Sequence, residues 1–345
     1  LLGSGNFCNV YKGVYKRTGE AHDVAIKICH NGRRGDNVVE DRKNAQKAMT
    51  SEAEVMSYYV HNHIIQFYGL ACDHPPILIV MEYCPGGSLD KLLKKEKENI
   101  SMAERIIYSL EAARGMRYLH SKHCIHRDLA ARNCLISSNG YIKIADFGLS
   151  KIVGNEDDVD IENGGANTQI PLRWMAPESL KKPMRFCSKT DVWAYSILLY
   201  EIFNNGIKPW ADDTNWPPKQ IAGHIRKCLM PDLPQKMPKD IIDLVKTIWV
   251  LDADSRPTMN VICNKLMEIR RKYPAPSSDK LVINKIDGVH RTQTTLDTID
   301  AEDESCATQD SKLKRFLIRQ FQQTFRQKTD SHDNTEMTQK TSIEK

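Results

Sequence analysis

The sequence predicts an α+β protein with two parts, a strand-rich N-terminal part and a larger, mainly helical C-terminal part. Short runs enriched in β-branched and aromatic residues, such as residues 63–69 and 76–83, indicate strands, and a single helix is predicted among them at residues 50–59. The Cys-Pro-Gly-Gly sequence at residues 84–87 then interrupts the pattern. Helical spacing dominates beyond it, first at residues 88–97 and then at 102–121. We expect a ligand site where the two parts meet, because ligands commonly bind there.

Composition narrows the class of protein. The chain has 345 residues, of which 41% are hydrophobic and 27% charged, as in ordinary globular proteins. A net charge of +5, without a basic stripe interleaved with aromatic residues, argues against nucleic-acid binding. Ten cysteines without CxxC or zinc spacing indicate free thiols in the reducing cytoplasm. The longest apolar run, residues 192–203, is too short to span a bilayer. The chain begins inside a motif at Leu1, so we expect a fragment of a longer protein.

The most informative pattern is HRDLAARN at residues 126–133, followed by DFG at residues 146–148. Between them, residues 134–136 and 141–144 are predicted to be two strands joined by the turn at 137–140. Such a hairpin would place the two polar clusters side by side at one of its ends.

These clusters suit phosphoryl transfer, in which positioning and charge neutralisation do most of the work. Asp128 could accept a proton from a substrate hydroxyl. Asn133 and Asp146 offer the oxygen ligands that Mg²⁺ prefers. The alternative is that an Asp and an Asn beside a hairpin simply cap turns.

The N-terminal part offers a second set of candidates. The Gly3-Ser4-Gly5 turn could bring backbone N–H groups close to phosphates, although a plain hairpin turn explains it equally. Lys27 ends the strand Val-Ala-Ile-Lys, where a lysine is otherwise usually a solvated edge residue. We expect it to pair with Glu52 of the predicted helix, with Glu54 as the rival. The polar residues 31–44 before the helix are expected to form a loop.

Together these motifs identify a family. Residues 1–273 contain, in order, GSGNFCNV, VAIK, HRDLAARN, DFG, APE and DVW, and this order resembles protein kinases. HRDLAARN resembles the tyrosine-specific branch, because Ala130 stands where serine/threonine kinases usually have lysine, and Arg132 comes later. The sequence PLRW at residues 171–174 is similar to the tyrosine-kinase substrate platform. The longer sequence SKHCIHRDLAARNCLI at residues 121–136 and the ending IRRK at residues 269–272 most resemble the Fes/Fer-type cytoplasmic kinases.

The resemblance implies a bilobal protein-kinase fold, with an N-lobe at residues 1–83, a hinge at 84–87 and a C-lobe at 88–273. It implies a non-receptor enzyme that transfers the γ-phosphoryl group of ATP to tyrosine hydroxyls of proteins in intracellular signalling, with Mg²⁺ or Mn²⁺. It also implies an upstream SH2 domain and a cytoplasmic or membrane-peripheral location. A pseudokinase scaffold and a serine/threonine kinase are the alternatives.

By the same resemblance, residues are assigned to roles. The catalytic residues would be Lys27, Glu52, Asp128, Arg132, Asn133 and Asp146. The metal would be held by Asn133 and Asp146. The nucleotide would contact Leu2, Gly3, Ser4, Gly5, Val10, Ala25, Lys27, Met81, Glu82, Cys84 and Leu135. A regulatory stack would contain Met56, Phe67, His126 and Phe147. Asp191 would hold the backbone of the HRD turn, and Arg256 would pair with Glu178.

Two departures from the family pattern stand out. Cys8 replaces the third glycine of the phosphate loop and could offer a reactive thiol there, although a tolerated substitution is the simpler interpretation. No tyrosine lies between Asp146 and Glu178, where related kinases are phosphorylated. Its place falls near Asp160 in an acidic stretch that could neutralise Arg127, so that a carboxylate could partly stand in for the phosphate, unless that stretch is simply a solvated loop.

The end of the chain is polar, and residues 274–345 are expected to form a disordered tail. Within it, residues 312–328 have the pattern of a basic amphipathic helix, which could contact a membrane or a calmodulin-like partner. A helix docked on the kinase, or a tail without a role, are the alternatives.

Overall fold

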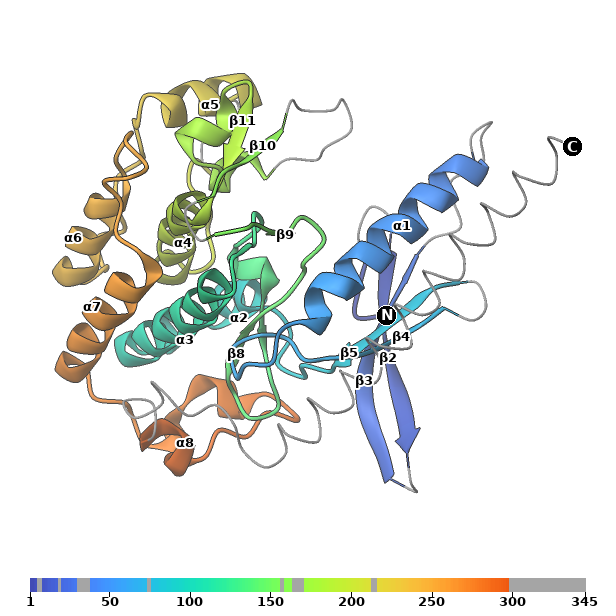
Figure 1. Cartoon of the computed structure of the whole chain (residues 1–345). Coiled ribbons are helices and arrows are strands. Elements are labelled where there is room, and N and C mark those ends of the chain that lie inside the picture. Colours follow the sequence, from blue (N-terminus) through green and yellow to red (C-terminus); the bar gives the residue numbers. More distant parts are fainter. Residues whose placement is uncertain are drawn as a thin grey trace, which may run out of the picture. The chain divides into compact units, whose positions relative to one another are not determined.

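The computed structural model describes residues 1–4, 8–17, 20–29, 38–72, 76–155, 158–162, 171–211 and 216–297. They form two compact units (Figure 1). Of the described residues, the first unit contains those within Leu1–Val60 and Gln66–Glu82, and the second contains His61–Ile65 and those from Tyr83 to residue 297. The unit boundary at Glu82 lies beside the hinge that the sequence predicts.

The first unit is an antiparallel sheet with one helix. The strands are β1 (Gly3–Ser4), β2 (Cys8–Arg17), β3 (Glu20–Cys29), β4 (Phe67–Ala71) and β5 (Leu78–Glu82), and the helix is α1 (Val38–Ser57). The sheet order is β1-β2-β3-β5-β4, so strand β3 is central and pairs with both β2 and β5. Helix α1 contacts β4 and β3. The side chains of Met49, Ala53 and Met56, spaced at helical intervals, are buried and anchor the helix.

Two boundaries differ from the predictions. Helix α1 begins at Val38, so the predicted loop is wrong for residues 38–44. This segment contains no glycine or proline, and the helix extends back to it from the buried anchor at Met49. The predicted strand at residues 63–69 begins only at Phe67, because His61–Ile65 belongs to the second unit, where Ile64 bridges Ile144 of a hairpin strand.

The second unit is mainly helical, as the sequence predicts. Its longer helices are α2 (Leu89–Glu96), α3 (Met102–Ser121), α4 (Ser188–Phe203), α5 (Pro218–Arg226), α6 (Lys239–Ile248) and α7 (Met259–Lys272). Its strands form three short pairs: β6 (Cys124–Ile125) with β9 (Lys151–Ile152), β7 (Cys134–Ile136) with β8 (Ile142–Ile144), and β10 (Asp160–Glu162) with β11 (Met184–Phe186). Helix α3 starts at a capping box between Ser101 and Glu104 and packs against α4 and α7.

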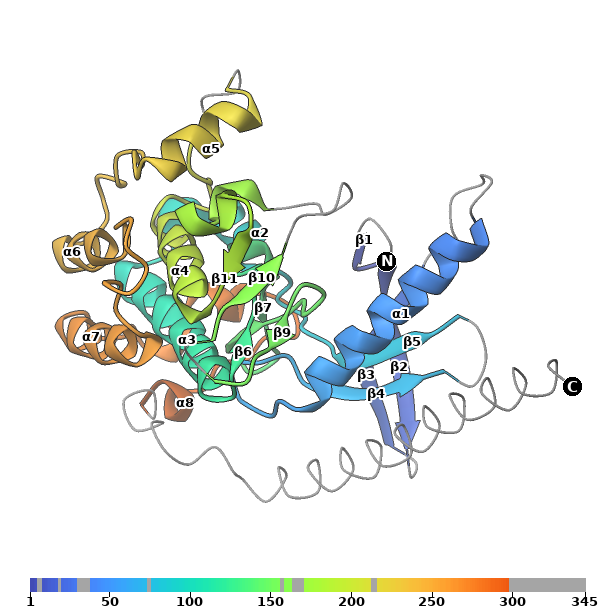
Figure 2. The same ribbon diagram turned by 45° about the horizontal axis from the view of Figure 1, so that its top comes forward.

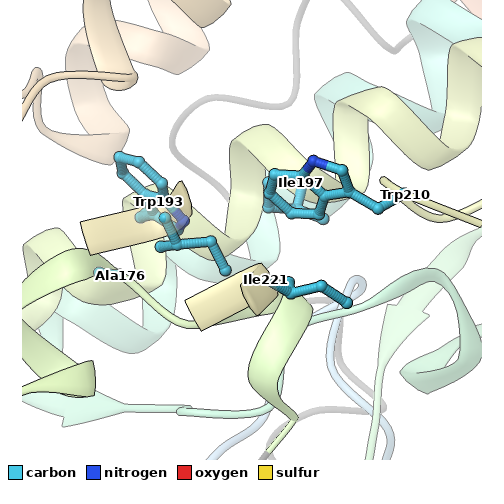
Figure 3. Close-up of a cluster of buried hydrophobic side chains, with 6 residues drawn as sticks. Ala176, Trp193, Ile197, Trp210 and Ile221 are labelled. Carbon is cyan, nitrogen blue, oxygen red and sulfur yellow. The ribbon is translucent and has the colours of Figure 1, made fainter. Parts of the chain in front are cut away.

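Helix α4 is the centre of this unit, because every residue in Asp191–Phe203 is buried. Trp193 and Ile197 of this helix pack against Ala176, Trp210 and Ile221, as Figure 3 shows. The cluster joins α4 to α5 and to the segment that follows the predicted substrate platform. A fully buried tryptophan contributes on the order of 3 kcal/mol through burial alone. The cluster therefore stabilises the packing of α4 against α5 and the neighbouring segment.

The chain does not lose order after α7, and the predicted disordered tail is wrong up to residue 297. Residues 277–297, called here the C-terminal strap, contain two 3₁₀ turns, Ser278–Lys280 and Val282–Lys285, and the short helix α8 (Gln293–Asp297), coloured orange to red in Figure 2. The apolar run Leu281–Val282–Ile283 explains the order, because all three side chains are buried. The predicted helix at 312–328 lies outside the described residues.

Among the helices that the structure describes, none has the length and hydrophobicity that a membrane-spanning segment requires.

Candidate active site

The lysine and glutamate predicted in the first unit meet. Nζ of Lys27, on β3, lies 2.7 and 2.8 Å from the two carboxylate oxygens of Glu52, on α1. Both side chains are largely buried, with exposed fractions of 16% and 6%. The rival Glu54 is exposed and accepts a bond from Tyr58 instead. The structure thus confirms the pairing and provides a fixed cation on the central strand, which suits the binding of a phosphate oxygen.

The other candidates of the first unit lie on the same sheet. Gly3 and Ser4 form β1, opposite Val10 and Asn9 of β2. The backbone N–H of Leu2 donates to the carbonyl of Val10 at 2.7 Å.

Ala25 and Met81 are both buried and face each other across β3 and β5. Glu82 ends β5, and Gly5 lies outside the described residues. The two remaining candidates belong to the second unit, where Cys84 is buried and Leu135 lies half-buried on β7.

In the second unit, the side chain of Asp128 is held from two sides. Nδ2 of Asn133 donates to the backbone oxygen and to Oδ2 of Asp128, both at 2.7 Å. Arg132 forms an ion pair with Oδ1 of the same carboxylate. Burial raises the pKa of Asp128, Arg132 opposes the shift, and the nearby negative charge of Asp146 adds to it. The carboxylate is therefore oriented and more basic than a solvated one.

The backbone of the HRD turn is held by Asp191 at the start of α4. Its carboxylate accepts bonds from the N–H of His126 at 2.8 Å and of Arg127 at 2.9 Å, and it lies 3.1 Å from Nε2 of His120. Arg127 has φ of 67°, a left-handed conformation that costs energy for a non-glycine residue. The predicted role of Asp191 is confirmed, and its hydrogen bonds offset that cost.

Asn133 and Asp146 have donor atoms that fit a hard cation. Because both bonds of Asn133 use its amide nitrogen, the amide oxygen is available as a ligand. Asp146 is exposed, with φ of 65°. No group of three or more His, Cys, Asp or Glu side chains that could hold a metal occurs in the described ranges. An Asn–Asp pair leaves several positions for water and phosphate oxygens, which is how Mg²⁺ is usually bound.

Two of the predicted stack residues are in contact in the second unit. The rings of His126 and Phe147 lie edge to face, with their centroids 5.2 Å apart. Met56 and Phe67 are both buried in the first unit.

The acidic stretch pairs with Arg127, as the sequence suggested. Nη1 of Arg127 donates to Oε1 of Glu162 at 2.7 Å, and Nη2 forms an ion pair with Asp160. The guanidinium also lies 4.4 Å from the ring centroid of Phe186 on β11. Asp158 instead accepts a bond from the backbone of Asn155, and the other two acids of the loop, Glu156 and Asp157, lie outside the described residues.

One polar residue of this region, Glu201, was not predicted from the sequence to have a role in the site. Glu201 of α4 is 4% exposed and accepts bonds from the N–H of Ala131 at 2.9 Å and from Nε1 of Trp174 at 3.0 Å. Burial raises the pKa of Glu201 to about 7, although these bonds oppose the shift. Arg132 in turn lies over the ring of Trp174, 4.5 Å from its centroid. The signal in the sequence was a lone glutamate inside the apolar run 192–203.

The remaining predicted pair is confirmed. The guanidinium of Arg256 forms a bidentate ion pair with the carboxylate of Glu178, at 2.6 and 2.9 Å, and the Arg256 side chain is fully buried.

Cys8, which replaces the third glycine of the phosphate loop, lies beside a second cysteine. Cys8 lies directly opposite Cys29 on the neighbouring strand, and their sulfur atoms are 3.7 Å apart. Burial raises the pKa of Cys8 to about 12, and Cys29 adds to the shift. The suggestion of a reactive thiol is therefore not supported, because little thiolate exists at neutral pH.

Comparisons with known proteins identify the family of the chain. The family model "Protein tyrosine and serine/threonine kinase" matches residues 1–266. The chain is 36% identical over 273 residues to tyrosine-protein kinase Fer of Homo sapiens, covering 79% of this chain and 31% of that protein. It is 36% identical to the transforming protein Fps of avian sarcoma virus (79% and 48%) and 34% identical to Fer-related kinase 1 of Caenorhabditis elegans (77% and 64%). The chain spans only about a third of the length of Fer. With its motifs, fold and site in agreement, the chain belongs to the protein tyrosine and serine/threonine kinase family.

Proposed function

We propose that this chain catalyses transfer of the γ-phosphoryl group of ATP to tyrosine hydroxyls of protein substrates. The observation that carries the proposal is the arrangement around Asp128. Its carboxylate is oriented by Asn133 and Arg132, and the acidic side chain of Asp146 is close enough to raise its pKa. An oriented base beside a cation-binding carboxylate is what phosphoryl transfer to a hydroxyl requires.

In this mechanism Asp128 orients the substrate hydroxyl and accepts its proton as the oxygen attacks the γ-phosphorus and ADP leaves. Lys27, positioned by Glu52, neutralises charge on the α- and β-phosphates. Asn133 and Asp146 would hold Mg²⁺ or Mn²⁺, which supplies charge neutralisation on the phosphate oxygens.

The remaining assigned residues would bind ATP itself. Backbone groups of Leu2, Gly3, Ser4 and Gly5 would lie along the phosphates, and the apolar side chains of Val10 and Ala25 would contact the adenine. Met81, Glu82, Cys84 and Leu135 are assigned to the adenine by the same family resemblance. The burial of Ala25 and Met81 on the sheet supports an apolar surface of this kind.

Selection of tyrosine over serine follows from the contacts of Arg132. This side chain pairs with Asp128 and stacks on Trp174, and Trp174 is fixed by Glu201. The stack builds an aromatic surface beside the base, and the longer reach of a phenol would suit it. Ala130, in the position of the lysine of the other branch, is fully buried and offers no cation.

We also propose a setting for this activity. Nine cysteines among the described residues are free thiols, which fits a cytoplasmic protein. Resemblance to Fer-type kinases supports an upstream SH2 domain and a membrane-peripheral location. The basic helix predicted at 312–328 could contribute a membrane or calmodulin-like contact.

The test is an assay of the protein with Mg-ATP on matched peptides that differ only in Tyr, Ser or Thr. We expect phosphorylation of the tyrosine peptide. Asp128→Asn should lower turnover by about 10²–10⁴-fold while nucleotide binding is kept, because only the proton acceptor is removed. Asp232→Asn, at an exposed position of the same unit, is the matched control. Equal rates on Tyr and Ser peptides would refute tyrosine specificity, and near-normal turnover of Asp128→Asn would refute the mechanism.

A further inference from the structure

The C-terminal strap lies beyond the family match, which ends at residue 266, yet it is packed like core. Five of its apolar side chains are at most 5% exposed: Leu281, Val282, Ile283, Val289 and Leu296. The backbone N–H of Val282 donates to the buried carboxylate of Glu104 on α3, at 2.7 Å. These contacts fix the strap on the second unit.

The strap inserts a charged residue into that unit. Arg291 is 1% exposed, and its Nη2 lies 2.5 Å from Oε1 of Glu111, a residue of α3 that is fully buried. Nη1 donates to the carbonyl of Gly140 at 3.1 Å, and the guanidinium lies over the ring of Tyr141. Asn284 fixes the backbone of Arg291 by two hydrogen bonds. A buried carboxylate needs such a partner, because an uncompensated charge in the interior is strongly destabilising.

Glu111 connects this pair to the catalytic hairpin. Its second oxygen, Oε2, accepts a bond from the N–H of Ile142, the first residue of β8, at 2.9 Å. Strand β8 ends at Ile144, two residues before Asp146. The N–H of the intervening Ala145 donates to the carbonyl of Asn133 at 2.8 Å. One carboxylate therefore joins Arg291 to the strand that leads into the metal-binding position.

The strap also holds the turn of the same hairpin. The N–H of His290 donates to the carbonyl of Ser138 at 2.7 Å. Gly140 has φ of 71°, and a Cβ built there would lie 2.8 Å from atoms of both Ile283 and Arg291. The strap thus contacts the hairpin at its turn, the end opposite to Asn133 and Asp146. Two strands of three residues each are not stable by themselves, so such support matters.

We propose that the strap is part of the catalytic unit and that Arg291 is a positioning residue. Acting through Glu111, it holds the β7–β8 hairpin and thereby sets the positions of Asn133 and Asp146. The catalytic consequence rests on the proposed function of those two residues, whereas the bracing of the hairpin does not. A small displacement of a metal ligand lowers turnover strongly, because phosphoryl transfer depends on positioning.

The experiment compares Arg291→Met with Lys285→Met in the full chain. Both changes remove a cation from the strap, but Lys285 is exposed. In Arg291→Met we expect amide hydrogen exchange at Ile142 and Ile144 to be at least about tenfold faster. The Mg²⁺ concentration for half-maximal activity should rise and kcat should fall, with KM for the peptide unchanged. Lys285→Met should match the wild type in all four measurements.

A second variant tests the route through Glu111. In Glu111→Gln/Arg291→Met the neutral amide oxygen can still accept the N–H of Ile142, and no charge is left unpaired. We expect this double variant to recover much of the exchange protection and of the Mg²⁺ dependence. It also provides the comparison if the single variant does not fold.

The outcomes separate the alternatives. Unchanged exchange at Ile142 and Ile144 in Arg291→Met would overturn the bracing. A lower melting temperature, with kcat and Mg²⁺ dependence of the folded fraction unchanged, would overturn the positioning role. Absence of phosphoryl transfer by the wild type would count against the proposed function, while the exchange measurement would still decide whether Arg291 braces the hairpin.

Discussion

Neutralising the two acids that hold Arg127 should reduce basal activity. The perturbation is Asp160→Asn/Glu162→Gln, which keeps side-chain shape and removes both charges. Arg127 is 6% exposed and its two partners are 31% and 35% exposed, so solvent weakens each pair without abolishing it. A charged hydrogen bond in such a setting contributes about 1–2 kcal/mol, and two together contribute about 2–4 kcal/mol. Since about 1.4 kcal/mol corresponds to tenfold, the ordered loop should lose roughly 30- to 1,000-fold in population relative to disordered forms.

The assay is turnover of a tyrosine peptide by the purified chain, before and after treatment with phosphatase. Asp158→Asn is the control, because Asp158 lies in the same segment and bonds only locally to Asn155. We expect phosphatase to leave the wild-type rate unchanged, the double variant to lose most of its activity, and added salt to lower the wild-type rate moderately by screening. Unchanged turnover in the double variant, or a large loss on dephosphorylation of the wild type, would refute the idea that carboxylates stand in for a phosphate.

Three further predictions concern buried groups. In the folded protein the pKa of Glu201 is about 7, above its ordinary value of 4.5. The unfolded chain therefore loses the proton first, so stability falls as pH rises from about 4.5 to 7 and then levels off. Glu201→Gln should remove that slope, worth about 3 kcal/mol at most, in urea titrations at several pH values, and an unchanged slope would contradict the assignment. Cys8 should react with iodoacetamide at pH 7.5 far more slowly than the exposed Cys72, as read by peptide mass spectrometry, and faster labelling of Cys8 would show that its thiol is not suppressed. Arg256→Met should destabilise the second unit by about 3–5 kcal/mol, since it leaves Glu178 without its partner, and a melting temperature like that of the wild type would disprove the importance of the pair.

The sequence predicted those features that depend on local pattern. Helix α3 was predicted with its observed bounds from the helical spacing of its apolar residues, and the structure adds a capping box between Ser101 and Glu104 at its start. The pairing of Lys27 with Glu52, and of Arg256 with Glu178, followed from motifs whose spacing is diagnostic. The same holds for the hairpin between HRDLAARN and DFG.

The features that the sequence did not predict depend on distant contacts. The strap lies in a polar stretch of sequence, and it is ordered by contacts with residues far earlier in the chain, such as those of Val282 with Glu104 and of Arg291 with Glu111. Glu201 looked like an interruption of an apolar helix, because its partners, Ala131 and Trp174, are not adjacent in sequence. The start of α1 was placed too late, since the buried anchor at Met49 could not be recognised without the sheet.

The hydrogen bonds of Asp191 have a consequence for cooperativity. The carboxylate of Asp191, near the start of the buried helix α4, accepts hydrogen bonds from the backbone N–H groups of both His126 and Arg127 and lies 3.1 Å from Nε2 of His120. Local opening of the HRD turn alone is therefore costly, because it would remove both backbone donors of a buried carboxylate. Opening of this turn and unfolding of α4 should belong to one cooperative event. In mild denaturant, the loss of kinase activity should therefore coincide with the unfolding of the helical unit. Peripheral loops differ, because they can open locally at little cost in free energy.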